Sequence, residues 1–187
     1  MTSAEERQAL LRIARRAIAA HLAGERASAI DLSGAPAAPG GAFVTLRRHE
    51  ELRGCIGHIE ADGPVGAVVA RCAVASATED PRFPAVTRLE LVEIAIELSL
   101  LGPLETAGAE TVEVGRHGLV VEMGWRRGLL LPQVATERNW DRETFLAETC
   151  HKAGLPGDAW EHGATLEAFT AEVFSELPRP ALKHKTA

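Results

Sequence analysis

Residues 94–101 carry the pattern that most restricts the fold, because apolar side chains recur there at every second position. The apolar positions are Ile94, Ile96, Leu98 and Leu100, and Gly102-Pro103 ends the run. Successive side chains of a strand point to opposite faces of a sheet, so this alternation predicts a strand with one buried face. A chain that contains such a strand must pack a sheet against another apolar layer.

The other periodic segments predict that this layer contains helices. Apolar residues at helical spacing predict helices at 4–22, 64–79 and 142–153. A capping-box sequence begins the first helix, and Gly24 and Gly154 stand where the first and third helices end. Further strand patterns occupy residues 42–46, 52–59, 119–123, 128–131 and 169–173. Because helices and strands mix irregularly, the expected class is α+β, with helices packed on a mixed or antiparallel sheet.

Length and charge limit the kinds of protein that this chain can be. Its 187 residues suit one domain, or one domain with a smaller lobe, and 46% hydrophobic residues are enough for a buried core. Lys plus Arg number 20 and Asp plus Glu 26, so the net charge is −6, which disfavours binding to nucleic acid or an anionic membrane through bulk charge. Only 4% of residues are aromatic, too few for a base-stacking platform.

The cysteines and the N-terminal residues bear on the compartment. Three cysteines without CxxC spacing indicate neither a disulfide framework nor a four-thiolate zinc site, and reduced thiols fit the cytoplasm. Residues 1–24 lack the continuous apolar stretch of a signal peptide or a membrane span. We therefore expect a cytoplasmic protein that does not enter a membrane.

The most informative segment for chemistry is residues 52–58. In an extended chain Arg53, Cys55 and Gly57 share one face of the strand, which places a guanidinium beside a thiol. A neighbouring cation favours the thiolate, the form of cysteine that acts as a nucleophile. Gly54 and Gly57 flank the cysteine, and glycine inside a strand often marks a close approach of ligand or backbone. The alternative is that Cys55 is a small buried hydrophobic residue and the glycines serve sheet packing.

Cys150 and Lys152 form a second candidate at the end of the predicted helix 142–153. The helix dipole disfavours a thiolate at a C-terminus, whereas a cation such as Lys152 is favoured there and could offset that effect. The alternative is a buried cysteine followed by ordinary C-terminal helix cations.

Three further residues stand where sites are often assembled. Arg82 lies in the rigid turn at residues 80–84, where it could bind an anionic group or only pair with Asp80. His117 precedes one predicted strand and Gln133 follows another, although both can be turn residues. No HExxH pair, GxGxxG, Walker loop or GxSxG elbow occurs, so we expect no metal site and no nucleotide-binding or serine-hydrolase chemistry.

The string Leu-Arg-Gly-Cys-Ile-Gly at residues 52–57 reproduces a known signature, LRGCIG. On this string the chain resembles the AMMECR domain family, whose prokaryotic members are called AmmeMemoRadiSam system protein A. The resemblance continues in the family's order over about residues 5–177, through these blocks: 41–46, 80–84, 96–101, 115–119, 130–135, 150–155 and 174–176.

The resemblance implies a fold with a larger lobe and a small subdomain, the signature lying near the cleft between them. Residues 1–177 would form this two-lobed domain, and residues 178–187 a polar C-terminal tail. The prokaryotic name implies a Memo-type protein and a radical-SAM enzyme as partners in a pathway that modifies a small molecule or an RNA base. An iron–sulfur cluster and SAM would belong to the partner enzyme, because this chain lacks a CxxxCxxC motif, so no cofactor is expected here.

The leading hypothesis is a cysteine-dependent enzyme with Cys55 as the nucleophile. Arg53 would activate Cys55, Arg82 would hold an anionic substrate group, and backbone amides near Gly54 and Gly57 would stabilise developing negative charge.

Two other hypotheses remain open. The chain could be a non-catalytic binding module or scaffold for the Memo-type and radical-SAM partners, or a metal carrier that uses Cys55 and Cys150. For the enzyme, second-tier candidates that the fold would have to supply are His117, Gln133, Cys150 and Lys152.

Overall fold

The structure is a computed structural model of the chain and describes residues 2–25, 30–60 and 62–176. The chain divides into two compact units. Unit 1 contains the residues up to Leu101 and those from Glu172 onward, and unit 2 contains Gly102–Ala171. Strand β7 (Thr165–Ser175) contributes residues to both units. The predicted polar tail at 178–187 lies outside the described residues.

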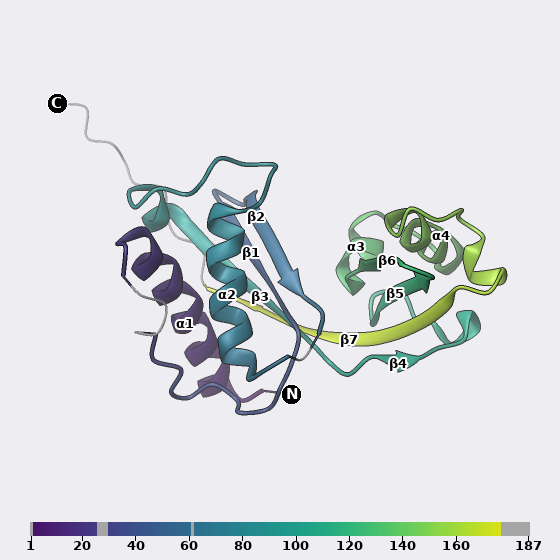
Figure 1. Ribbon diagram of the computed structural model, residues 1–187, viewed down its shortest axis with the longest axis horizontal. Coiled ribbons are helices and arrows are strands. Elements are labelled where there is room, and N and C mark those ends of the chain that lie inside the picture. The colour runs from purple at the N-terminus through teal and green to yellow at the C-terminus, as the bar shows by residue number, and fades with distance from the viewer. Residues whose placement is uncertain (1, 26–29, 61, 177–187) are drawn as a thin grey trace. The chain divides into compact units, whose positions relative to one another are not determined.

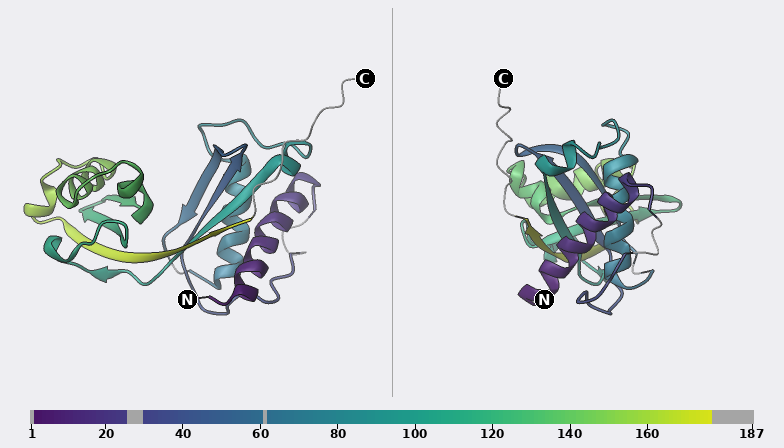
Figure 2. Two further views of the ribbon diagram at one scale, coloured as in Figure 1. Left: turned by 180° about the vertical axis from the view of Figure 1, so that it is seen from behind. Right: turned by 90° about the vertical axis from the view of Figure 1, so that its left-hand side faces the viewer.

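Unit 1 is a sheet with two helices on one face (Figure 1). Its strands lie in the order β2 (Glu51–His58), β1 (Ala42–Arg48), β3 (Ile94–Leu101) and then β7. Helices α1 (Ala4–Leu22) and α2 (Val65–Thr78) pack against each other and against these strands, as Figure 2 shows from two further directions. A short 3-10 helix, η2 (Glu90–Glu93), precedes β3. The buried core between helices and sheet includes Leu10, Ile13, Val44, Leu46, Val68, Val69, Ile96 and Leu98.

Strand register sorts the residues of this sheet between its two faces. Val44 pairs with Leu98, and both are fully buried in the core beneath the helices. The neighbouring row crosses the sheet from Cys55 through Thr45 to Glu97, which pair directly from strand to strand. Because successive residues point to opposite faces, this row lies on the face away from α1 and α2.

Unit 2 contains a second group of strands with helices packed on it. Strand β5 (His117–Met123) lies between β6 (Arg126–Leu130) and β7, and the two-residue β4 (Glu105–Thr106) pairs with β7. Helix α4 (Arg142–Lys152) packs on β5 and β6, and α3 (Pro132–Glu137) packs on β5. The 3-10 helices of this unit are η3 (Ala109–Thr111) and η4 (Ala159–Glu161). The buried core includes Leu119, Val121, Phe145, Leu146 and Cys150.

The capping box and the two glycines lie at the helix ends that the sequence predicts. The Ser3 hydroxyl accepts a hydrogen bond from the Glu6 N–H at 3.2 Å, and the Glu6 carboxylate accepts one from the Ser3 N–H at 2.7 Å, which closes the capping box. Gly24 and Gly154 follow α1 and α4 with φ of +75° and +72°, a left-handed conformation that favours glycine.

The α+β class is confirmed, and the pairings of β1 with β2 and β3, of β5 with β6 and β7, and of β4 with β7 are all antiparallel. The sequence patterns missed α3 and β4, which are too short to show a period. Within the described part of the chain, no helix is long and apolar enough to cross a membrane.

The β1–β2 hairpin closes more tightly than its charged sequence indicates. Arg48 pairs with Glu51, so that only His49 and Glu50 form the loop, with φ of +51° and +71°. Two-residue hairpin loops of this kind favour glycine, because the left-handed conformation costs a residue with a Cβ about 1–2 kcal/mol.

Replacing Glu50 by glycine is expected to stabilise the protein by about 0.5–1 kcal/mol, since relief of the left-handed cost exceeds the extra freedom of the unfolded chain. Urea unfolding at neutral pH measures the change. Glu51→Gly is the matched control, because Glu51 already lies in β2 and glycine weakens a strand. Equal effects of the two substitutions would contradict the assignment of strain to the loop.

Candidate functional site

Cys55 lies in the middle of β2, and the residue is partly exposed. The hydroxyl of Thr45, directly opposite on β1, donates a hydrogen bond to this sulfur at 3.4 Å. Thr45 itself is only 7% exposed, so its hydroxyl is held in a fixed environment. The thiol therefore has one ordered polar neighbour and one side that a reagent can reach.

Ser76, near the end of α2, and Asp80, in the turn after it, hold the backbone around the thiol. The Asp80 carboxylate accepts the Cys55 N–H at 2.8 Å, and the Ser76 hydroxyl accepts the Ile56 N–H at 2.8 Å while donating to the Val44 carbonyl at 2.8 Å. Both acceptors are buried. These two amides are thus already engaged, and neither is free to stabilise an oxyanion as the hypothesis from the sequence requires.

The glycines of the signature lie where the protein's own atoms approach most closely. A Cβ on Gly54 would stand 2.2 Å from the Ser76 carbonyl oxygen of α2. A Cβ on Gly57 would stand 2.2 Å from the ring of Phe43, which occupies the opposite position on β1. Both glycines therefore serve packing, and neither leaves its space open to a ligand.

Arg82 is bound to Asp80 by two hydrogen bonds, of 2.9 Å from Nε and 2.7 Å from Nη2. These bonds, together with those from the Cys55 and Arg82 amides, hold the pKa of Asp80 well below its usual range despite its burial. The pKa of Arg82 is raised, chiefly by the hydrogen bonds to Asp80 and to a smaller extent by the nearby Cys55 sulfur. The Arg82 side chain remains 54% exposed, so part of its guanidinium is available to an anion.

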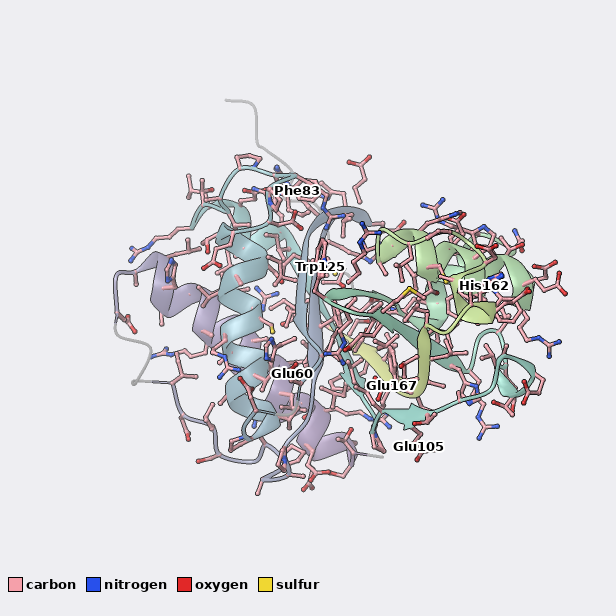
Figure 3. All side chains as sticks on the ribbon, turned by 45° about the vertical axis from the view of Figure 1, so that its right-hand side comes forward. Glu60, Phe83, Glu105, Trp125, His162 and Glu167 are labelled. Atoms are coloured by element: carbon pink, nitrogen blue, oxygen red, sulfur yellow. The ribbon has the colours of Figure 1, made fainter. Side chains whose placement is uncertain are left out.

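Arg53 is directed to a carboxylate. Its guanidinium donates to the two oxygens of Glu90 at 2.6 and 3.1 Å, and its side chain is only 12% exposed. Burial would raise the pKa of Glu90, but the hydrogen bonds and charge of Arg53 outweigh burial and lower it. Arg53 and Arg82 also lie 5.8 and 5.4 Å from the centre of the Phe83 ring, the side chain labelled in the loop after α2 (Figure 3). The positive charge of Arg53, which the sequence analysis expects to activate Cys55, is therefore compensated by Glu90.

Four candidate residues belong to unit 2, and their surroundings are described within that unit. Cys150 is fully buried in the core of unit 2, and burial raises the pKa of its thiol. Lys152 is exposed at the end of α4, and Gln133 lies in the first turn of α3. His117 begins β5, where its Nδ1 accepts the Glu113 N–H at 3.1 Å, and it lines a cavity of about 460 Å³. Among the described residues, no group of three His, Cys, Asp or Glu side chains could hold a metal ion.

Sequence patterns did not single out Thr45 or Glu97 as site residues. Both lie in predicted strands as alternate, non-core positions, so their side of the sheet could be inferred. Their position beside Cys55 depends on the register of three strands, which no spacing along the chain encodes.

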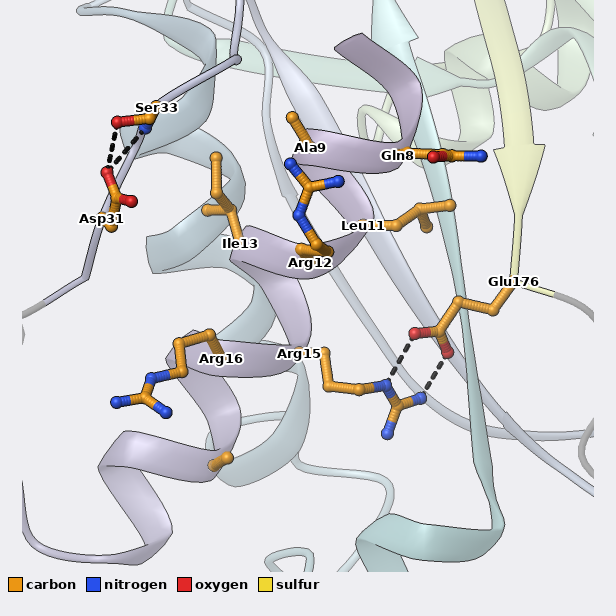
Figure 4. A pocket seen from close by; sticks show the side chains of 11 residues that line it. Gln8, Ala9, Leu11, Arg12, Ile13, Arg15, Arg16, Asp31, Ser33 and Glu176 are labelled. Atoms are coloured by element: carbon orange, nitrogen blue, oxygen red, sulfur yellow. Dashed lines mark hydrogen bonds and ion pairs between the residues drawn. The ribbon is translucent and has the colours of Figure 1, made fainter. Parts of the chain in front are cut away.

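A groove in unit 1 is lined by none of the predicted site residues. It runs along α1 with a volume of about 860 Å³ and is drawn in Figure 4. Arg15 in this groove is committed to Glu176, to which its Nε donates at 2.6 Å, and to the carbonyls of Leu91 and Ile94.

The exposure of the three thiols predicts a selective reaction at Cys55. Iodoacetamide at neutral pH should modify Cys55 at least about tenfold faster than Cys72 or Cys150, because both of these are buried and burial raises their pKa values. Peptide mapping by mass spectrometry after timed quenching gives the three rates. The unfolded protein, in which all three thiols are exposed, is the control, and equal rates in the folded protein would contradict the placement of Cys55.

Comparison with known proteins places this chain in a family. The sequence model of the AMMECR1 family matches residues 11–174. A protein of Methanococcoides burtonii is 42% identical over 184 residues, covering 95% of this chain and 92% of the relative, and one of Methanothermobacter thermautotrophicus is 44% identical, covering 93% and 96%. The crystal structure of an uncharacterised protein from Pyrococcus horikoshii superposes with a TM-score of 0.84 at 41% identity, covering 94% of this chain and 92% of that one. These matches confirm the resemblance carried by the signature at residues 52–57, and the chain belongs to the AMMECR1 family.

Proposed function

We propose that this protein is a cysteine-dependent enzyme in which Cys55 is the nucleophile. The observation that carries the proposal is the partly exposed residue Cys55, whose backbone is held by Asp80 and Ser76 and whose sulfur accepts a hydrogen bond from Thr45. A nucleophile gains rate from being held in one orientation, and buried hydrogen bonds supply that rigidity. An inert buried cysteine needs neither solvent access nor such a support.

In this proposal the two arginines have different roles. Arg82 is the residue that meets substrate, because its partly exposed guanidinium is bound to Asp80, which also accepts the Cys55 N–H, and it keeps donors beyond those used by Asp80. Arg53 is a positioning residue that ties β2 to η2 through Glu90. The substrate accordingly carries an anionic group near the carbon that the sulfur attacks. The Cys55 thiol gives up its proton to water, the sulfur forms a bond to that carbon, and the leaving group departs with the electron pair of the bond that breaks and takes up a proton from water.

The family name supplies the proposed setting of the reaction. We place this enzyme in the cytoplasm, in a pathway with a Memo-type protein and a radical-SAM enzyme that modifies a small molecule or an RNA base. The net charge of −6 favours the small molecule, because a nucleic acid would be repelled by the bulk charge of the chain.

A second candidate function is a non-catalytic binding module for the same two partners. The observation that favours it is the compensation of Arg53 by Glu90 and of Arg82 by Asp80, which leaves the thiol beside neutralised pairs. In that case the signature shapes a surface, and Cys55 tolerates serine.

Complementation with Cys55→Ser separates the two functions. In cells that lack only this protein, metabolite profiling identifies the compound that accumulates, and wild type should reverse the accumulation. For an enzyme, Cys55→Ser fails to reverse it while still co-purifying with the partners. Full reversal by Cys55→Ser would refute the nucleophile and support the binding module. Urea unfolding of the variant checks that its fold is intact.

A further inference from the structure

A cavity of about 360 Å³ lies in unit 1 beside the row that contains Cys55. Arg47, Ala95 and Glu97 line it from β1 and β3, at alternate positions that share the sheet face of Thr45 and Cys55. The remaining lining includes the strained hairpin loop and the end of β7. Its size is that of a pocket for a small molecule.

Two carboxylates on the wall of this cavity, those of Glu93 and Glu176, are satisfied by arginines that the cavity lining does not include. Glu93 accepts a hydrogen bond from Arg48 at 2.7 Å. Glu176 accepts from Arg15 at 2.6 Å and from the Ile96 N–H at 3.1 Å. Neither Arg48 nor Arg15 lines the cavity, so the Glu93 and Glu176 carboxylates are paired with arginines outside it.

Arg47 and Glu97 differ from these pairs. Their nearest charged atoms, Nη2 and Oε1, are 4.0 Å apart, which is too far for a charge-assisted hydrogen bond of about 2.7–2.9 Å. Among the described residues, none donates a hydrogen bond to the Glu97 carboxylate, although its side chain is only 24% exposed. Arg47 and Glu97 thus face a small cavity close together but without a hydrogen bond between them, and Arg47 donates only a long bond, of 3.4 Å, to the carbonyl of Glu50, whose side chain is exposed at the edge of the cavity.

We propose that this cavity binds the zwitterionic head of an amino acid, with its ammonium on Glu97 and its carboxylate on Arg47. An ammonium supplies the donors that Glu97 lacks, and a carboxylate matches the fork of the arginine. A ligand with only one charge would leave the other wall group unpaired. The open pair therefore selects for both charges at once.

This inference rests on the proposed function in one respect: it takes the bound amino acid to be the substrate that Cys55 attacks. Glu97 lies two strands from Cys55, so their backbones are roughly 10 Å apart at the usual strand spacing. An amino acid seated on Arg47 and Glu97 would have to reach the sulfur with the end of a long side chain. The substrate class is accordingly an amino acid, or a compound with the same head, whose reactive carbon lies several bonds from that head.

Three probes with the same propyl side chain test the head group. L-norvaline has both charges, butylamine is the same molecule without its carboxylate, and pentanoate is the same molecule without its ammonium. Titration of wild type, followed by ¹⁵N–¹H spectra, should show saturable binding of norvaline at millimolar concentrations and at least tenfold weaker binding of the other two. No saturable binding of norvaline, or equal binding of all three, would overturn the proposal.

Variants then assign the binding to the two residues. Glu97→Gln and Arg47→Met should each weaken norvaline binding at least tenfold, whereas Glu51→Gln, an exposed carboxylate at the start of β2, should leave it unchanged. Urea unfolding of each variant confirms its fold. Unaltered binding by a folded Glu97→Gln would also overturn the proposal.

Cys55→Ser keeps this test separate from that of the proposed function. The serine variant should bind norvaline as wild type does, since the thiol lines no part of the cavity. Norvaline binding together with full complementation by Cys55→Ser would retain the pocket and refute the nucleophile. Absence of norvaline binding together with failure of Cys55→Ser to complement would retain the nucleophile and refute the pocket.

Discussion

Gly54→Ala is expected to destabilise the protein by about 3 kcal/mol or more, the upper range for a group forced into a packed interior. The added Cβ would lie 2.2 Å from the Ser76 carbonyl oxygen, which is a backbone atom of α2 and cannot rotate away. Relief requires α2 to move off β2, which would also pull the Ser76 hydroxyl from the Ile56 and Val44 backbone. Urea unfolding followed by circular dichroism measures the loss.

Gly63→Ala is the matched control for this substitution. No atom lies within 4 Å of a Cβ built on Gly63, and its φ is not in the left-handed region, so alanine there should change the stability by less than about 0.5 kcal/mol. If Gly54→Ala were as mild as this control, the close packing of α2 on β2 would be refuted. The glycine would then be explained better by access of a ligand to the thiol.

The strands and long helices could be predicted because each carries its own period. The alternation at 94–101 gives β3, and the caps at Ser3 and Gly24 give the ends of α1. Alternation also predicts that Arg53 and Cys55 share a face, but the pairing of β2 with β1 skips Arg53 at an irregularity between Leu52 and Gly54, so the regular alternation does not extend to Arg53. The strand patterns at 42–46 and 52–59 leave five residues between them and therefore predict a longer turn than the two residues, His49 and Glu50, that form it, because charged residues give no sign of a two-residue loop.

The contacts of the site could not be predicted, because they depend on which carboxylate each arginine reaches. Arg53 is two residues from Cys55 on the same strand, yet its guanidinium binds Glu90, which is 37 positions away. The glycines illustrate the same limit. A pattern can show that something approaches Gly54, but only the packing of α2 shows that it is the Ser76 carbonyl.

Asp80→Asn is expected to destabilise the protein by about 2–3 kcal/mol at neutral pH, because a buried carboxylate that accepts hydrogen bonds from charged and backbone donors is replaced by a neutral amide. Asp80 accepts the Cys55 and Arg82 N–H groups and two bonds from the Arg82 guanidinium. Exposure of Arg82 moderates the cost, since water can solvate the guanidinium that loses its partner. Urea unfolding at neutral pH, and again in acid, measures the difference between variant and wild type.

The pH dependence of the stability difference between wild type and Asp80→Asn tests whether the Asp80 carboxylate causes that difference. The pKa of Asp80 is depressed in the folded protein, so its contribution is complete above the ordinary value of about 3.9 and is lost as the pH falls below that value. The gap between wild type and Asp80→Asn should therefore be constant near neutral pH and should narrow in strong acid. Asp62→Asn is the matched control, because Asp62 also accepts two hydrogen bonds from an arginine, Arg71, but on the surface, and its loss should be much smaller. A loss at Asp80 no larger than at Asp62 would mean that the carboxylate does not anchor the strand of Cys55, and the rigid support on which the nucleophile depends would be absent.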